Sequence, residues 1–459
     1  MSFPSTPPIS RELPSWSMPD VSSRCLDWGL RVVVARVGHL PMVHSRLLFR
    51  RGRVLEAPDL PGSARLLSLL ARHGTRSHTS VELAEALDQL GLRLRFSMGQ
   101  DSSVVSMTCL SEHWSTALSL LEEVAFHPSY PEHHLKRERQ KALDIHRHEC
   151  NDPGFLSSTT MGRLLYPDHA YGRPAATEEG LRETRRSDIL ALHHAVLQPA
   201  HGMLLVLGDV DAERTLDELS ERYREPFGGV ASPIEVPNAP VSSGSNIVAI
   251  ERAESEQVHI GLAMRLFPRS HPDYYPVTVM NRVLGAGASS RLFMELRERQ
   301  SLTYGAYSAL DLGRYGGDLF TSLDCAPEKA PRALDALCVE VDRMREEVVP
   351  ESELIQARRT MSGTFPNRVL GLGGLAGLLS SQWSHSLPED VWIRHLERIA
   401  QVTAEDVSSA AEQWLAPEGR QVVLVGPPAA LDAALKGRGP VERRDARSMN
   451  STQHTEGAL

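Results

Sequence analysis

The chain has 459 residues, which is too many for one hydrophobic core and indicates several domains. Its formal net charge is -9 and its Lys and Arg residues do not gather into a basic stripe, so nucleic acid is not an expected partner. Five cysteines lie far apart without a C-x-x-C pair. This spacing is typical of buried thiols in a reducing compartment, and it argues against a disulfide framework or a Cys-based zinc site.

The N-terminal stretch, residues 1–22, is rich in Pro and Ser and has no apolar run. It predicts a disordered lead-in, without the features of a signal peptide or a membrane anchor. We therefore expect a cytoplasmic protein with no membrane partner.

Strands and helices alternate through residues 23–227. Apolar and β-branched runs predict strands at 30–35, 42–49 and 202–208, and a strand pair within 93–110. Helical periodicity and capping residues predict helices at 62–72, 81–90, 114–126, 131–148 and 187–197. These elements predict that residues 23–227 form one structural half of the protein, in which runs of strands are followed by runs of helices.

Residues 245–428 repeat this order. Strands are predicted at 246–250, 259–267 and 421–426 with a hairpin at 304–323, and helices at 273–284, 331–347, 350–363 and 403–414. The segments 193–208 and 412–426 share one succession of helix, Pro, polar turn, apolar strand and Gly, and such self-similarity indicates a duplication. The predicted fold is α+β, with two homologous halves that each form an antiparallel sheet with helices packed mainly on one face.

Three further segments lie outside these elements. Residues 228–244 are rich in Gly, Pro, Ser and Ala and predict a linker. Residues 429–459 predict a mostly disordered tail, from about Gly439 onward. The Gly-rich stretch 371–377 predicts a flexible loop or hinge.

Residues 62–75 read Gly-Ser-Ala-Arg-Leu-Leu-Ser-Leu-Leu-Ala-Arg-His-Gly-Thr, a buried helix closed by Gly74. Recognisable motifs also occur in four other segments: 169–174, 208–211, 285–304 and 402–407. Together they resemble the pitrilysin/insulinase zinc metallopeptidases, on the branch of the mitochondrial processing peptidase, over about residues 26–426.

The helix at 62–72 lacks the family's zinc chemistry. The resemblance places the two His and the Glu of the inverted motif H-x-x-E-H at Arg65, Leu69 and Ser68, and the third ligand at Ile145. Arg65 stays protonated, Leu69 has no lone pair, and Ser68 is a poor general base. We therefore expect no metal site in this chain. His146, His148 and Glu149 offer other donor atoms, but the two imidazoles do not share a helix face.

Arg297 and Tyr304 have the seven-residue spacing of the family's Arg/Tyr pair. The resemblance implies that this pair hydrogen-bonds substrate carbonyls beside the scissile bond. A permanent cation and a phenol donor suit a site where negative charge develops. The alternative reading is a charge on a solvated helix face and a tyrosine that packs in a hairpin.

The resemblance implies a zinc-less subunit of a heterodimeric metallopeptidase that cleaves unfolded peptides. No activity is then expected of this chain alone. Zinc is expected in a homologous partner subunit that carries the inverted motif, while Arg297 and Tyr304 act in trans, and the peptide is expected to add as a strand near 93–110. Two alternatives stay open: a non-enzymatic scaffold like the core subunits of respiratory complexes, and a homodimeric peptidase with a relocated metal site.

Overall fold

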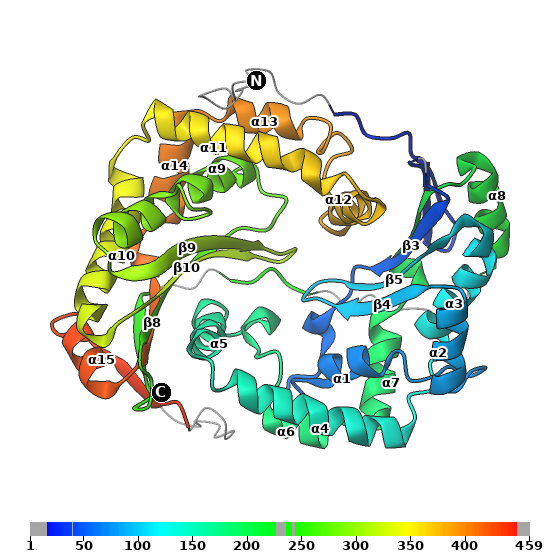
Figure 1. The fold of residues 1–459 in the computed structure, drawn as a ribbon, viewed down its shortest axis with the longest axis horizontal. Coiled ribbons are helices and arrows are strands. Elements are labelled where there is room, and N and C mark those ends of the chain that lie inside the picture. The colour runs from blue at the N-terminus through cyan, green and yellow to red at the C-terminus, as the bar shows by residue number, and fades with distance from the viewer. Residues whose placement is uncertain (1–15, 39, 226–235, 241–243, 448–459) are drawn as a thin grey trace, which may run out of the picture.

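The computed structural model describes residues 16–38, 40–225, 236–240 and 244–447. Most of the expected linker, 228–244, lies outside the described residues, as do positions 1–15 and 448–459. The described chain forms two halves, each built on one six-stranded sheet. Figure 1 shows these sheets side by side, with the N-terminal half in blue to green and the C-terminal half in green to red.

The N-terminal sheet has the order β1-β2-β6-β3-β5-β4. Its strands are β1 (Ser22–Cys25), β2 (Arg31–Arg36), β3 (Met42–Phe49), β4 (Arg93–Met98), β5 (Ser103–Leu110) and β6 (Gly202–Gly208). All pairs are antiparallel except β2 with β6, because the chain returns late to place β6 between β2 and β3.

Helices cover the outer face of this sheet, where apolar residues of alternate strand positions form the first core. They are α1 (Ser63–Leu70), α2 (Ser80–Gln89), α3 (Trp114–Phe126), α4 (Glu132–Glu149), α6 (Glu178–Glu183), α7 (Arg186–Val196) and α8 (Ala212–Arg222). Fully buried leucines such as Leu66, Leu67 and Leu121 fill the space between helices and strands.

The C-terminal sheet repeats this plan with the order β12-β7-β11-β8-β10-β9. Its strands are β7 (Asn246–Glu251), β8 (Val258–Leu266), β9 (Thr303–Leu312), β10 (Gly317–Cys325), β11 (Gln421–Gly426) and β12 (Glu442–Asp445). The parallel pairs are β7 with β11 and β7 with β12. The helices against its outer face are α9 (Tyr274–Leu284), α10 (Ala330–Glu346), α11 (Glu351–Thr364), α13 (His395–Gln401), α14 (Ala404–Trp414) and α15 (Pro428–Leu435).

Two helices cross between the halves. Helix α5 (Pro153–Leu165) follows the N-terminal helices in sequence but packs on β8 and β11, where Leu156, Met161 and Leu165 join strand residues of the C-terminal sheet. Helix α12 (Leu372–Ser384) does the reverse and packs on β3 and β6 through Leu375 and Ala376. Each half thus covers the inner face of the other half's sheet, and Figure 1 shows α5 and α12 between the two sheets.

The architecture of two homologous α+β halves is confirmed, with sheets that are mixed rather than purely antiparallel. The flexible loop expected at 371–377 is wrong: these glycines open α12, because the small residues are followed by Leu375 and Leu378, which are buried. Helix α5 was not expected, because Asp152 and Pro153 read as a stop; they instead cap and begin a new helix.

The two termini are more ordered than expected within the described residues. At the C-terminal end, α15 and β12 follow Gly426, since β7 offers an edge that β12 extends. At the N-terminal end, Trp16 packs edge-on against Phe365 with ring centroids 5.3 Å apart. Among the helices of these residues, none combines the length and apolar character needed to span a membrane.

Candidate functional site

Helix α1 is held at its N-terminus by a buried glutamate. Gly62 has φ +116°, and a Cβ there would lie 2.7 Å from the Leu181 side chain, so this position requires glycine. The Glu56 carboxylate accepts the backbone N–H groups of Gly62 and Ala64 at 2.9 and 2.8 Å and the Ser63 hydroxyl at 3.0 Å. It thereby satisfies donors that the helix start leaves open, and α1 is fixed against α4 and α7.

The position of the first motif histidine is occupied by an ion pair. Arg65 donates two hydrogen bonds, of 2.9 and 3.0 Å, to the carboxylate of Glu149 on α4. Both side chains are mostly buried, with 21% and 29% exposed. Glu149 lies four residues after Ile145 and so on the same face of α4. The guanidinium group therefore occupies the space between α1 and α4 and neutralises the carboxylate there.

The other two positions on α1 also have structural partners. The Ser68 hydroxyl donates to the Ala64 carbonyl one turn earlier, at 2.8 Å. Leu69 packs against the N-terminal core. Ile145 is 47% exposed on α4. Leu69 and Ile145 have no electron pair to give, and a neutral serine hydroxyl is not one of the usual zinc ligands, so the residues do not fit the zinc that the family resemblance would put here.

His146, His148 and Glu149 do not form a metal site either. His146 is buried, and burial first and then the nearby Arg65 charge lower its pKa. His148 is exposed, while Glu149 is bound to Arg65. Across the described part of the chain, no three His, Cys, Asp or Glu side chains are grouped so that they could hold a metal ion.

Arg297 lies on η5 (Phe293–Arg299), a π-helical segment that follows α9. The buried Leu296 fixes this segment in the C-terminal core. The Arg297 guanidinium carbon lies 4.6 Å from the centroid of the buried Phe293 ring, and its Nε is 3.5 Å from the Glu298 carboxylate. The side chain is 44% exposed, so its charge is positioned by a ring and remains open to solvent.

A strained turn connects η5 to β9 and sets the position of Tyr304. Ser301 has φ +52°, a left-handed conformation that is uncommon for a residue other than glycine. Lys329 holds this turn by donating to the Ser301 carbonyl at 2.8 Å, and the Thr303 hydroxyl donates to the Asp324 carbonyl at 2.6 Å. Tyr304 follows at the start of the edge strand β9 and is 88% exposed.

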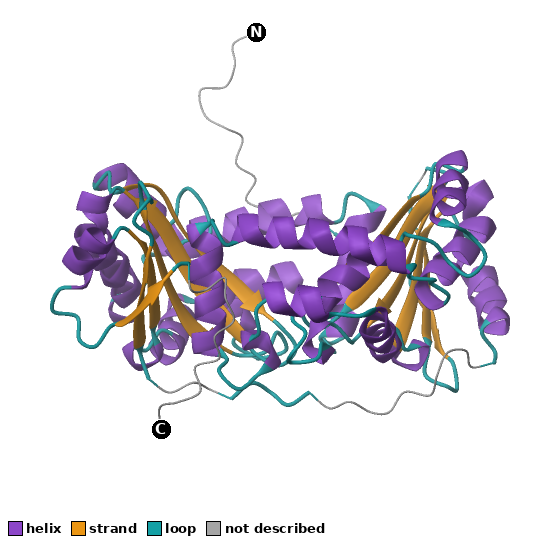
Figure 2. Cartoon of the chain, turned by 90° about the horizontal axis from the view of Figure 1, so that it is seen from below, coloured by secondary structure: helices purple, strands orange, loops and turns teal. Residues whose placement is uncertain are grey.

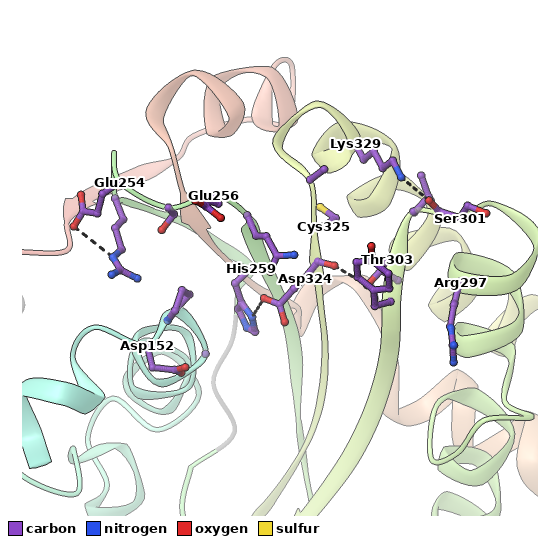
Figure 3. A pocket seen from close by; sticks show the side chains of 18 of the residues that line it. Asp152, Glu254, Glu256, His259, Arg297, Ser301, Thr303, Asp324, Cys325 and Lys329 are labelled. Carbon is purple, nitrogen blue, oxygen red and sulfur yellow. Dashed lines mark hydrogen bonds and ion pairs between the residues drawn. The ribbon is translucent and has the colours of Figure 1, made fainter.

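Arg297 and Tyr304 line one large open cleft of about 1310 Å³. Figure 3 shows Arg297 on one wall, and Asp152 at the start of α5 across from it. The cleft floor carries a pair from neighbouring strands, in which His259 Nδ1 is 2.9 Å from the Asp324 carboxylate. The cleft thus combines the predicted cation and phenol with carboxylates and an imidazole.

The structure brings together Arg297 and Tyr304, but it keeps them apart from the degenerate motif. Arg65, Ser68, Leu69 and Ile145 belong to the N-terminal half, and none of them lines this cleft. The sequence reasoning missed the pairing of His259 with Asp324, which depends on the register of β8 and β10. It also missed the Arg65–Glu149 pair, although the presence of both residues beside the motif positions was a usable signal.

Comparison with known proteins gives consistent findings. Residues 31–163 match the family described as insulinase (peptidase family M16), and residues 185–361 match the family described as peptidase M16 inactive domain. An uncharacterized zinc protease of Mycobacterium leprae is 27% identical over 402 residues, which cover 85% of this chain and 88% of that protein.

Two solved structures are similar over most of the chain. The peptidase M16 inactive domain from Pseudomonas fluorescens has a TM-score of 0.83 with 23% identity, covering 89% of this chain and 98% of that one. A protease from Helicobacter pylori has a TM-score of 0.83 with 18% identity, covering 89% and 100%. With matches to both halves that extend over most of its length, the chain belongs to the insulinase family of peptidases, M16.

Proposed function

We propose that this chain is the zinc-less, substrate-gripping subunit of a heterodimeric M16 peptidase. The observation that carries the proposal is the replacement of metal-binding chemistry by the Arg65–Glu149 ion pair, together with the placement of Arg297 and Tyr304 in an open cleft. A homologous partner with an intact inverted zinc motif supplies the metal. The substrate is an unfolded peptide.

The exposure of the pair supports a role toward another molecule. Among the described residues, none accepts a hydrogen bond from the Tyr304 hydroxyl, and its backbone belongs to strand β9, which is paired with β10. Because the Tyr304 side chain is 88% exposed, it adds little to the packing of the C-terminal core, and packing does not explain why a tyrosine stands at this position. Arg297 and Tyr304 are suited to donate hydrogen bonds to a peptide carbonyl, where they would stabilise the negative charge that develops during hydrolysis.

The sheet edges support an extended substrate. Strand β4 ends the N-terminal sheet and β9 ends the C-terminal sheet, so each has one side without a strand partner among the described residues. An extended peptide can add to such an edge through main-chain hydrogen bonds. Tyr304 is the second residue of the edge strand β9, where its hydroxyl can reach a carbonyl of the bound peptide.

The proposal is tested by co-expression with a homologous chain from the same genome that carries the intact inverted zinc motif. Each chain alone and the purified pair are analysed for zinc and for cleavage of unfolded peptides. We expect a stable complex, cleavage only by the pair, and zinc only in the partner. Cleavage and stoichiometric zinc in this chain alone would overturn the proposal, and a stable complex without cleavage would favour a scaffold.

A further inference from the structure

A second cavity, of about 420 Å³, lies where the two halves meet. It shares no lining residue with the cleft at Arg297. The N-terminal half contributes basic side chains at the start of β2, the end of β3 and the turn before β6, and the C-terminal half contributes the β9–β10 turn and the end of α12. Its basic lining residues are Arg31, Arg50, Arg51, His201 and Arg314, and its aromatic ones are Tyr315 and Trp383.

The charge in this cavity is one-sided. Among the residues that the structure describes, four arginines and a histidine line it and no Asp or Glu does, although the chain as a whole carries a net charge of -9. Burial, and then the charges of Arg314 and Arg31, lower the pKa of Arg50 to about 10. Asp101 lies near Arg314, accepts its backbone N–H at 2.7 Å and attracts its charge, but it does not line the cavity. The guanidinium groups therefore repel one another in a partly desolvated space.

Backbone carbonyls and one aromatic ring contribute to holding these arginines in place. Arg50 donates to the Trp383 carbonyl and lies 4.1 Å above the Trp383 ring. Arg51 donates to the Ala195 carbonyl at 2.9 Å, and Arg314 donates to the Ser384 carbonyl at 3.3 Å. The Nε of Arg50 is buried and has no hydrogen-bond partner within the described residues. For Arg50 and Arg314 these carbonyls fix the geometry without themselves neutralising the charge, and Arg50 has one donor left over.

We infer that this cavity binds a small anion with at least two negative charges, carried by phosphate or carboxylate groups. Guanidinium groups present paired donors that match both kinds of oxyanion. The volume lies in the range of small-molecule sites. Arg31 and Arg50 from one half and Arg314 from the other would bind the same anion, which would relieve their repulsion and tie the halves together.

The test is calorimetric titration of the full chain with pyrophosphate and, separately, with citrate, at constant ionic strength. We expect one site per chain, with a dissociation constant below about 1 mM for at least one probe. Tighter binding of pyrophosphate would identify phosphate as the recognised group, and tighter binding of citrate would identify carboxylate. Failure of both probes to bind in this range would overturn the inference.

Variants separate this site from general surface charge. Arg31→Gln and Arg314→Gln should each weaken binding roughly 10- to 100-fold, the effect of losing a charged hydrogen-bond donor. Arg31 is the first residue of β2, so Arg31→Gln is the milder substitution and keeps the test available if Arg314→Gln unfolds the protein. Arg214→Gln is the matched control, because Arg214 is 78% exposed on α8 and pairs with Glu218. An equal loss of affinity in Arg214→Gln would overturn the inference.

Discussion

Arg297 and Tyr304 offer the sharpest test of function, because changing them should alter turnover without altering stability. Arg297→Ala or Tyr304→Phe should each lower kcat/KM of the assembled peptidase on the order of 10²-fold, the scale of losing one oxyanion donor. This corresponds to about 2.7 kcal/mol of transition-state stabilisation. Both side chains are substantially exposed, so the free energy of unfolding should change by no more than about 0.5 kcal/mol.

The assay is cleavage of a quenched fluorescent peptide by the purified complex, with urea unfolding of each variant. Arg299→Ala and Tyr307→Phe are the matched controls. Arg299 is 69% exposed on the same η5 segment and Tyr307 is 49% exposed on the same strand, and neither lines the cleft. If the controls lose as much turnover as the test variants, or if Arg297→Ala keeps full turnover, the assignment of the pair is refuted.

The double variant adds a second criterion. If Arg297 and Tyr304 grip the same carbonyl oxygen, the loss in the double variant should be smaller than the product of the two single losses, because groups that act as a unit are not additive. Fully multiplicative losses would indicate that the two side chains contact different parts of the substrate.

Three further predictions concern the chain by itself. Metal analysis of the unaltered chain should find no stoichiometric zinc, and tight zinc binding should appear only after the combined changes Arg65→His, Ser68→Glu, Leu69→His and Ile145→Glu. Burial lowers the pKa of His193 from 6.5 to about 4, so the folded state resists protonation of this side chain and loses stability as the pH falls below 6.5. Urea unfolding should show about 2 kcal/mol less stability at pH 5 than at pH 7 from this residue. The substitution His193→Gln should remove that difference. Leu156→Ala should cost about 2–5 kcal/mol in urea unfolding, because Leu156 is buried between α5 and the C-terminal sheet, whereas the exposed Ser158→Ala should cost less than about 0.5 kcal/mol.

The elements that could be predicted are those with local signals. The long helices α4 and α10 have clear periodicity, and strands β3, β6 and β11 are apolar runs between turn residues, so their bounds agree with the prediction to within about two residues. The duplication was visible because the same local signals recur in the same order.

The elements that could not be predicted depend on contacts between the halves. The apolar face of α5 meets a sheet whose strands begin almost a hundred residues later, and its first residues read locally as a stop. Helix α12 opens with glycines that favour a loop, and burial of Leu375 and Leu378 outweighs that preference. Strand β12 forms only because β7 has a free edge.

The candidate site divides in the same way. Alignment with the family's motifs identified Arg65, Ser68 and Leu69 as positions without metal-binding groups. The same alignment identified Arg297 and Tyr304 as a pair. It could not show that Glu149 binds Arg65, since that depends on how α1 and α4 lie against each other. It also could not show the cleft, because α5 forms one wall of it from the opposite half.

The crossing of α5 and α12 has a consequence for synthesis on the ribosome. When the chain has emerged as far as β6, α5 carries Leu156, Met161 and Leu165, but the sheet that covers them has not been made. The inner face of the first sheet likewise waits for α12, more than 160 residues after β6. The first half therefore cannot finish folding as it is translated, and the nascent chain must keep two apolar surfaces from aggregating until nearly its whole length is available.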